Sequence, residues 1–170
     1  MKGTGIVRRL DELGRIVIPK EIRKNLHIKE GTPIEIGITN DEIILKKFSP
    51  VKELGENATL CAEIMYDTLG VPIFVADLDK LVACAGTKYI KQNLKNDLKR
   101  IIDKRALVNL ENYNSNIFEE ETIKHKNLLI SPIIIDGDVL GSIIIDYKEY
   151  NSKLLEVTKL ATLFISKIAN

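Results

Sequence analysis

The stretch Asp11–Pro19 constrains the fold of this chain most strongly, because it places a turn, a short apolar run and a helix start within nine residues. Gly14 follows an acidic pair and permits the positive φ angle that a tight turn needs. The β-branched run 16–18 is typical of a buried strand, and the proline after it ends the strand because it lacks an N–H for the ladder. We therefore expect a hairpin of strands at residues 4–10 and 16–18, followed by a short helix at residues 19–26.

Two further strands complete the first 50 residues. Apolar residues alternate over residues 34–38, and a polar turn separates them from the apolar run 43–47. The segment has no large aromatic core, and units below about 70 residues are usually stabilised by oligomerisation. We therefore expect residues 1–50 to form an obligate dimer.

Basic side chains are concentrated in the same segment. Residues 1–50 contain ten Lys and Arg against seven acidic residues, whereas the remaining chain has 15 against 17. Four of the six arginines precede residue 24. Arginine forms bidentate contacts with phosphate and guanine, so this bias favours a nucleic-acid surface at the N-terminal end.

The remainder, residues 51–170, has the pattern of an α+β domain after a boundary at residues 48–50. The elements that we expect are helices and hairpins at 50–69, 71–86, 92–104, 128–145 and 154–168, with no clear pattern over 106–126. Helical seams at 51–65 and 154–168 leave two interpretations open. They pack within this domain, or they bundle with another protomer and join two dimers into a homotetramer.

Residues 4–24, TGIVRRLDELGRIVIPKEIRK, closely resemble the N-terminal segment of the AbrB-like transition-state regulators. The resemblance is strong over about 50 residues and weaker afterwards. It implies a swapped-hairpin dimer at residues 1–50, in which hairpins of two chains interleave, and a GAF-like α+β domain at residues 51–170. In function, it implies a DNA-binding transcriptional regulator of sporulation genes, acting as activator or repressor.

The resemblance also implies where double-stranded DNA binds. The family's DNA-contacting basic positions match Arg8, Arg15, Arg23 and Lys24, with Arg9 as a helper. Arginines on a turn and a short helix of a two-fold dimer can meet phosphates and base edges on one side of a duplex. From the residues alone, the alternative is a solvated face whose arginines pair with Glu12 and Glu21 within the chain.

Other functions have less support. The sequence contains no phosphate-binding loop or nucleophile elbow, so we expect neither an enzyme nor a cofactor. The two histidines and two cysteines, at residues 27, 61, 84 and 125, are too scattered to predict a metal site. Swapped-hairpin domains also occur in toxin partners, so an antitoxin-like protein-binding module is the second hypothesis.

Two further expectations concern the ligand and the compartment. GAF-like domains often hold a small molecule between sheet and helices, so the second domain has either an unknown small ligand or a structural role. No apolar run approaches the roughly 20 residues of a membrane span, and no apolar segment follows the basic N-terminus. The sequence therefore predicts a cytoplasmic protein that does not bind membranes.

Overall fold

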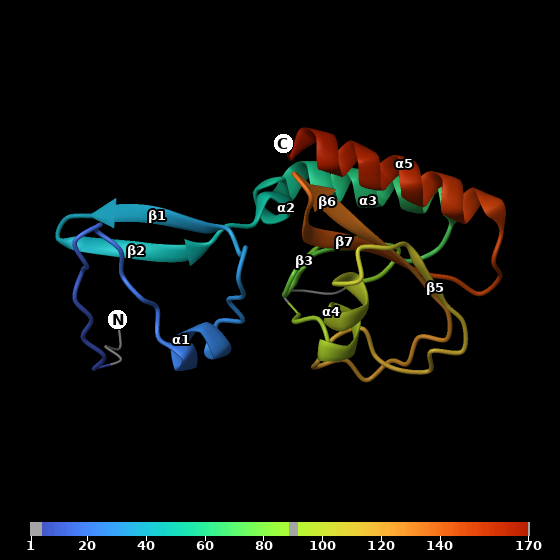
Figure 1. Ribbon diagram of the computed structural model, residues 1–170. Helices are drawn as coiled ribbons and strands as arrows, with labels where there is room; N and C mark the ends of the chain where they lie inside the picture. The colour runs from blue at the N-terminus through green and yellow to red at the C-terminus, as the bar shows by residue number, and fades with distance from the viewer. Residues whose placement is uncertain (1–4, 89–91, 170) are drawn as a thin grey trace. The chain divides into compact units, whose positions relative to one another are not determined.

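A computed structural model describes residues 5–88 and 92–169 and divides the chain into two units (Figure 1). The first unit ends at Phe48 and the second begins at Ser49. Each unit has its own secondary structure and is described separately below. Among the described residues, no helix combines the length and the apolar character needed to cross a membrane.

The N-terminal unit contains one short helix and one two-stranded sheet. Helix α1 (Lys20–Asn25) is followed by strands β1 (Ile34–Thr39) and β2 (Glu42–Lys47). The strands are antiparallel, with Ile36 opposite Leu45. The helix begins directly after Pro19, which is consistent with the preference of proline for a helix start. These elements confirm the helix and the second pair of strands that the sequence predicts.

The predicted hairpin ahead of α1 is present only as its turn. Residues 5–19 contain no strand, and Thr4, where the first strand was expected to begin, lies outside the described residues. Ile16 and Val17, which we expected to be buried, are each more than half exposed. A β-strand needs a neighbouring strand to pair its backbone groups, and the described part of a single chain offers none to residues 16–18. The prediction of a hairpin with a buried second strand at residues 16–18 is therefore wrong for one chain by itself.

The second unit is a five-stranded antiparallel sheet with helices on both faces (Figure 1). Its strands lie in the order β4-β3-β7-β6-β5. Their bounds are β3 (Ile73–Asp77), β4 (Leu81–Ala85), β5 (Val108–Leu110), β6 (Leu128–Ile135) and β7 (Asp138–Asp146). The two predicted hairpins are confirmed as β3–β4 and β6–β7, whereas the sequence pattern did not predict β5.

The helices of this unit differ from the prediction in two places. The helix expected at 50–69 is divided into α2 (Pro50–Glu53) and α3 (Gly55–Leu69). The helix expected at 92–104 is the shorter α4 (Asn96–Ile102). It begins later because the backbone of Leu94 is extended and donates its N–H to Asp79 O at 2.7 Å. The last helix, α5 (Ser152–Ile168), starts where the Asn151 side chain accepts the Leu154 N–H at 3.0 Å.

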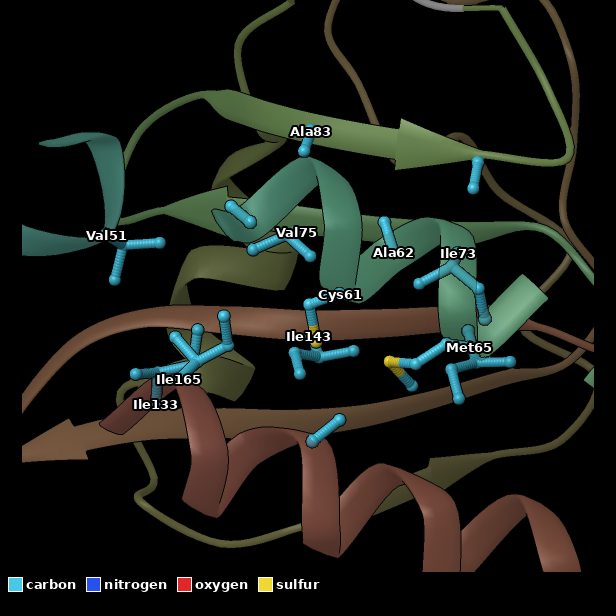
Figure 2. Close-up of a cluster of buried hydrophobic side chains, with 14 of the residues drawn as sticks. Val51, Cys61, Ala62, Met65, Ile73, Val75, Ala83, Ile133, Ile143 and Ile165 are labelled. Carbon is cyan, nitrogen blue, oxygen red and sulfur yellow. The ribbon is translucent and has the colours of Figure 1, made fainter. Parts of the chain in front are cut away.

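Apolar side chains fill both faces of the sheet, because successive residues of a strand point to opposite sides. On one face, α3 and α5 cover a cluster that includes Ile73, Ile143 and Ile165 (Figure 2). On the other face, α4 and neighbouring loops cover a second cluster around Phe74 and Phe118, whose rings meet edge to face. The second unit therefore buries a core within a single chain.

A charged network ties the loop 111–127 to the sheet. His125 is buried, and its two ring nitrogens contact Glu121 Oε1 at 2.7 Å and Asp146 Oδ2 at 2.8 Å. Glu121 also accepts the backbone N–H groups of Ile117 and Phe118. Burial lowers the pKa of His125, but the hydrogen bonds to Asp146 and Glu121 and the charges of both carboxylates outweigh it and raise that pKa. The two carboxylates thus favour the protonated form of His125.

This network predicts a pH-dependent stability. Because folding raises the pKa of His125, its stabilising contribution is complete below the unfolded value of 6.5 and disappears as the pH rises through the folded value. We expect His125→Gln to lower the free energy of unfolding by about 3–5 kcal/mol at about pH 6, because it leaves a buried carboxylate unpaired. Urea unfolding followed by circular dichroism at about pH 6 and about pH 9 measures both effects.

The matched control is His27→Asn, which removes the other histidine, an exposed residue with a positive φ angle that asparagine tolerates. The control should keep the pH dependence of the wild-type chain, whereas His125→Gln should flatten it. Equal pH dependence in both variants would contradict the assignment.

Candidate nucleic-acid interface

The best-defined feature of the N-terminal unit is the turn 11–15, which presents Arg15. The Asp11 N–H donates to Arg15 O at 3.0 Å, and the Gly14 N–H donates to Asp11 O at 2.9 Å. Gly14 has a φ angle of 72°, in the left-handed region that glycine adopts without a steric penalty. The turn therefore forms as the sequence predicts, even though the residues on either side of it are not paired as β-strands.

The Asp11 carboxylate holds this turn together and also orients the arginine side chain. Its Oδ1 accepts the N–H groups of Leu13 at 3.0 Å and Arg15 at 2.8 Å. Its Oδ2 accepts Arg15 Nε–H at 2.7 Å. These bonds, chiefly the one from the Arg15 backbone and then the one from its side chain, lower the pKa of Asp11. The carboxylate is therefore ionised and paired with Arg15.

Sequence reasoning missed this contact. It named Glu12 and Glu21 as the acids within reach of the arginines, whereas the structure pairs Arg15 with Asp11. The available signal was the spacing of an aspartate three residues before a glycine, since Asp side chains commonly bond to backbone N–H groups two residues on. Such a carboxylate has a second oxygen that is free to accept from a neighbouring side chain.

The other predicted basic residues are also exposed. Arg23 and Lys24 lie in the last turn of α1, a helix with no buried residue, and their positive charge complements the negative end of the helix dipole. Arg8 and Arg9 precede the turn 11–15, and Arg8 Nη1 donates to Val7 O at 3.1 Å. All five predicted side chains thus belong to one unit and reach solvent, from the segment before the turn, the turn itself and α1.

The same unit exposes a large amount of apolar surface. Outside the turn 11–15, six of its aliphatic residues are between 66% and 82% exposed: Val7, Leu10, Val17, Ile36, Ile38 and Ile43. Single exposed aliphatic residues are normal, but exposed apolar groups at this density mark an interaction surface. We call these six residues the N-terminal apolar surface.

The second unit has a similar surface on the outer sides of α3 and α5. The predicted seam 51–65 faces the core of its own unit, with Val51, Ala58, Cys61 and Met65 all buried. Other residues of the two helices are between 50% and 71% exposed: Leu60, Ile64, Leu160, Leu163 and Phe164. We call these five residues the helical apolar surface.

Residues 5–88 and 92–169 contain no group of three or more His, Cys, Asp or Glu side chains suited to a metal ion. His27 and His125, and Cys61 and Cys84, are not brought together as a cluster. Phe74, Phe118 and other apolar residues fill the space between the sheet and α4.

Among solved structures, the second unit is similar to the GAF domain of a phosphoenolpyruvate-protein phosphotransferase from Acinetobacter. The TM-score is 0.54 at 17% identity, and the match covers 71% of this chain and 87% of that chain. At this identity the likeness establishes the fold and nothing more. The α+β architecture with a GAF-like second domain is thereby confirmed.

Two sequence comparisons cover the N-terminal unit. The chain is 56% identical over 50 residues to the transition state regulatory protein AbrB of Bacillus subtilis, a match of 29% of this chain and 52% of that protein. A family model described as antidote-toxin recognition MazE, bacterial antitoxin, matches residues 7–53. Both matches therefore support the swapped-hairpin fold that the sequence predicts for residues 1–50.

Comparisons over most of the chain identify one family. Residues 53–168 match the family model described as stage V sporulation protein T C-terminal, transcription factor. Stage V sporulation protein T of Bacillus subtilis is 40% identical over 157 residues, which are 88% of this chain and 86% of that protein. With a basic AbrB-like unit followed by a GAF-like unit, the chain belongs to the stage V sporulation protein T family of transcription factors.

Proposed function

We propose that this chain is a DNA-binding transcriptional regulator of sporulation genes and not an enzyme. The observation that carries the proposal is the exposed basic set on the turn 11–15 and α1, in a chain that is 40% identical to stage V sporulation protein T. The chemistry fits, because arginines on a rigid turn can contact both phosphate oxygens and guanine edges. A regulator of this kind acts in the cytoplasm, as activator or repressor.

In the proposed complex, Arg8, Arg15, Arg23 and Lys24 contact double-stranded DNA, with Arg9 as a helper. Residues 1–50 of two chains interleave as swapped hairpins and cover the N-terminal apolar surface. The two-fold symmetry doubles the basic set and places it against successive grooves. Lys24 supplies a charge but not the planar fork of arginine, so its contact is with phosphate.

The second unit, residues 51–170, assembles these dimers. Its helical apolar surface pairs with the same surface of another chain, which gives a homotetramer of two DNA-binding dimers. Joining two DNA-binding dimers in this way raises affinity for paired sites without any new DNA contact. An unknown small ligand of the GAF-like unit is the alternative role for this domain.

The match of residues 7–53 to an antitoxin model favours a second candidate function, an antitoxin-like protein-binding module. Against it stands the second unit, which fills the position where a disordered toxin-binding tail would be expected. Purification of the chain from its own cells separates the two candidates. A stoichiometric small toxin partner would support the antitoxin, and its absence together with DNA binding would support the regulator.

The DNA proposal predicts a steep salt dependence. If a dimer neutralises about eight phosphates, a plot of log affinity against log salt should have a slope near −7. Arg15→Ala should weaken binding by about tenfold or more, because it removes one arginine contact from each half of the dimer. Fluorescence anisotropy with a labelled duplex, titrated at several salt concentrations, measures both quantities.

The control for this experiment is Arg100→Ala, which removes one positive charge from an exposed position of α4 in the second unit. It should leave both the affinity and the slope unchanged. A flat salt dependence of the wild-type chain, or equal binding by Arg15→Ala and the wild type, would contradict the proposal.

The swapped dimer predicts the effect of a charge in the N-terminal apolar surface. Val17→Asp should halve the mass of the assembly and abolish DNA binding, because the dimer buries a side chain that one chain leaves 72% exposed. Asn40→Asp introduces the same charge in the exposed turn between β1 and β2 and should change neither. Light scattering of the full chain decides the point, and an unchanged mass for Val17→Asp would refute the swapped dimer.

The tetramer predicts a separate effect for the second surface. Leu160→Glu should convert a tetramer into a dimer that still binds DNA, because Leu160 lies on α5 and is 71% exposed. Lys159→Glu, at the preceding exposed position, serves as the control and should leave the tetramer intact. If light scattering gives the same mass for both variants, the helical apolar surface does not join the dimers.

A further inference from the structure

The contact between Asp11 and Arg15 divides the hydrogen-bonding groups of the arginine into two sets. The guanidinium Nε–H is bound to Asp11 Oδ2, and both partners of this bond belong to the same turn. Within the described residues, the two terminal Nη groups have no further hydrogen-bond partner, and the Arg15 side chain is 70% exposed. The outer edge of the guanidinium is therefore the part of the side chain that is available to a ligand.

The outer edge carries two parallel N–H groups, which match the O6 and N7 acceptors of guanine in the major groove. A surface arginine without a partner samples many rotamers and loses that freedom on binding. Because Asp11 already fixes Nε, Arg15 has less freedom to lose and a narrower choice of contact geometry. A guanidinium that is held in one orientation is better suited to a base edge than to a phosphate. The acceptors of a base edge have one fixed arrangement, whereas a phosphate accepts hydrogen bonds from many directions.

The charge of Asp11 gives an independent argument. A carboxylate beside the phosphate backbone is repelled by it, so Asp11 weakens the electrostatic attraction that all DNA sequences share. An acidic residue within a basic surface is therefore unfavourable for non-specific binding. The acidic residue can nevertheless increase sequence specificity if it improves the contact with one DNA sequence, because specificity is the difference between the affinities for two sequences.

We propose that Asp11 determines sequence specificity by positioning Arg15, so that the outer edge of its guanidinium contacts a guanine in the major groove. This inference rests on the proposed DNA-binding function and adds a residue to it. Asp11 itself touches no base. Its role is to hold the Arg15 side chain in one orientation and to lower affinity for other sequences.

The test compares Asp11→Asn with Glu12→Gln in the full chain. The asparagine Oδ1 can still accept the N–H groups of Leu13 and Arg15, so the turn is kept, but its Nδ2 is a donor and cannot accept from Arg15 Nε. Glu12→Gln removes the same charge from the next residue, and Glu12 is not the acid that pairs with Arg15. The two variants therefore differ in the positioning contact and not in net charge.

Two duplexes serve as probes: one selected from a random pool with the wild-type chain, and a shuffled duplex of the same composition. We expect Glu12→Gln to tighten binding to both duplexes equally. Asp11→Asn should tighten binding to the shuffled duplex but lower the ratio of the two affinities by about tenfold or more, the discrimination typical of a bidentate contact. Equal ratios in the two variants would overturn the inference and leave the proposed function intact, whereas a wild-type chain that binds neither duplex would overturn both.

Two further measurements distinguish positioning from a structural role. In the Arg15→Lys background, which lacks the fork, adding Asp11→Asn should leave the affinity ratio unchanged, so the double-mutant cycle should show coupling. Without DNA, the Arg15 Nε–H resonance of the wild-type chain should exchange slowly with solvent, and Asp11→Asn should accelerate this exchange by about tenfold or more. An additive cycle would overturn the inference. An Arg15 Nε–H that exchanges fast in the wild-type chain would also overturn it, and that measurement does not require Asp11→Asn to fold.

Discussion

The N-terminal unit depends on an apolar surface that a single chain leaves exposed to solvent. The six residues of the N-terminal apolar surface, among them Val7, Val17 and Ile38, are at least 66% exposed, and no residue of α1 is fully buried. Burying apolar surface gains about 25 cal/mol for each square ångström, so this unit has a strong drive to associate with a second copy. This gain in free energy favours the proposed dimer. The dimer in turn carries the basic residues twice, so that the two copies could contact DNA together.

The second unit is different because it completes its own core. Both faces of its sheet are covered, and His125, Glu121 and Asp146 tie the loop 111–127 to the end of the central strand β7. Most of the large apolar side chains that it leaves exposed lie on α3 and α5, although Ile123 and Tyr150 are also exposed. The two units therefore differ: the first leaves much of its apolar surface exposed within one chain, whereas the second encloses a core of its own.

The turn 11–15 is the place where local structure and the proposed function meet. One carboxylate satisfies two backbone N–H groups and the Nε–H of Arg15, so the conformation of the turn and the direction of the side chain have the same cause. In the proposed complex, an arginine held in this way presents the same edge of its guanidinium to each DNA duplex. Its orientation is set within one chain, because both partners of the ion pair lie in the turn.

The amino-acid sequence by itself predicted the short helix after Pro19, the β1–β2, β3–β4 and β6–β7 hairpins, the tight turn at Gly14 and the location of the basic residues, because these depend on local periodicity, turn chemistry and charge. It also supported the family through residues 4–24. Only the tertiary structure decided which carboxylate holds Arg15, that α4 begins at Asn96 and that residues 16–18 lack a ladder within one chain. The reason is physical: these features depend on groups brought together by folding, on backbone pairing between distant segments and, for residues 16–18, on surface that a single chain leaves uncovered.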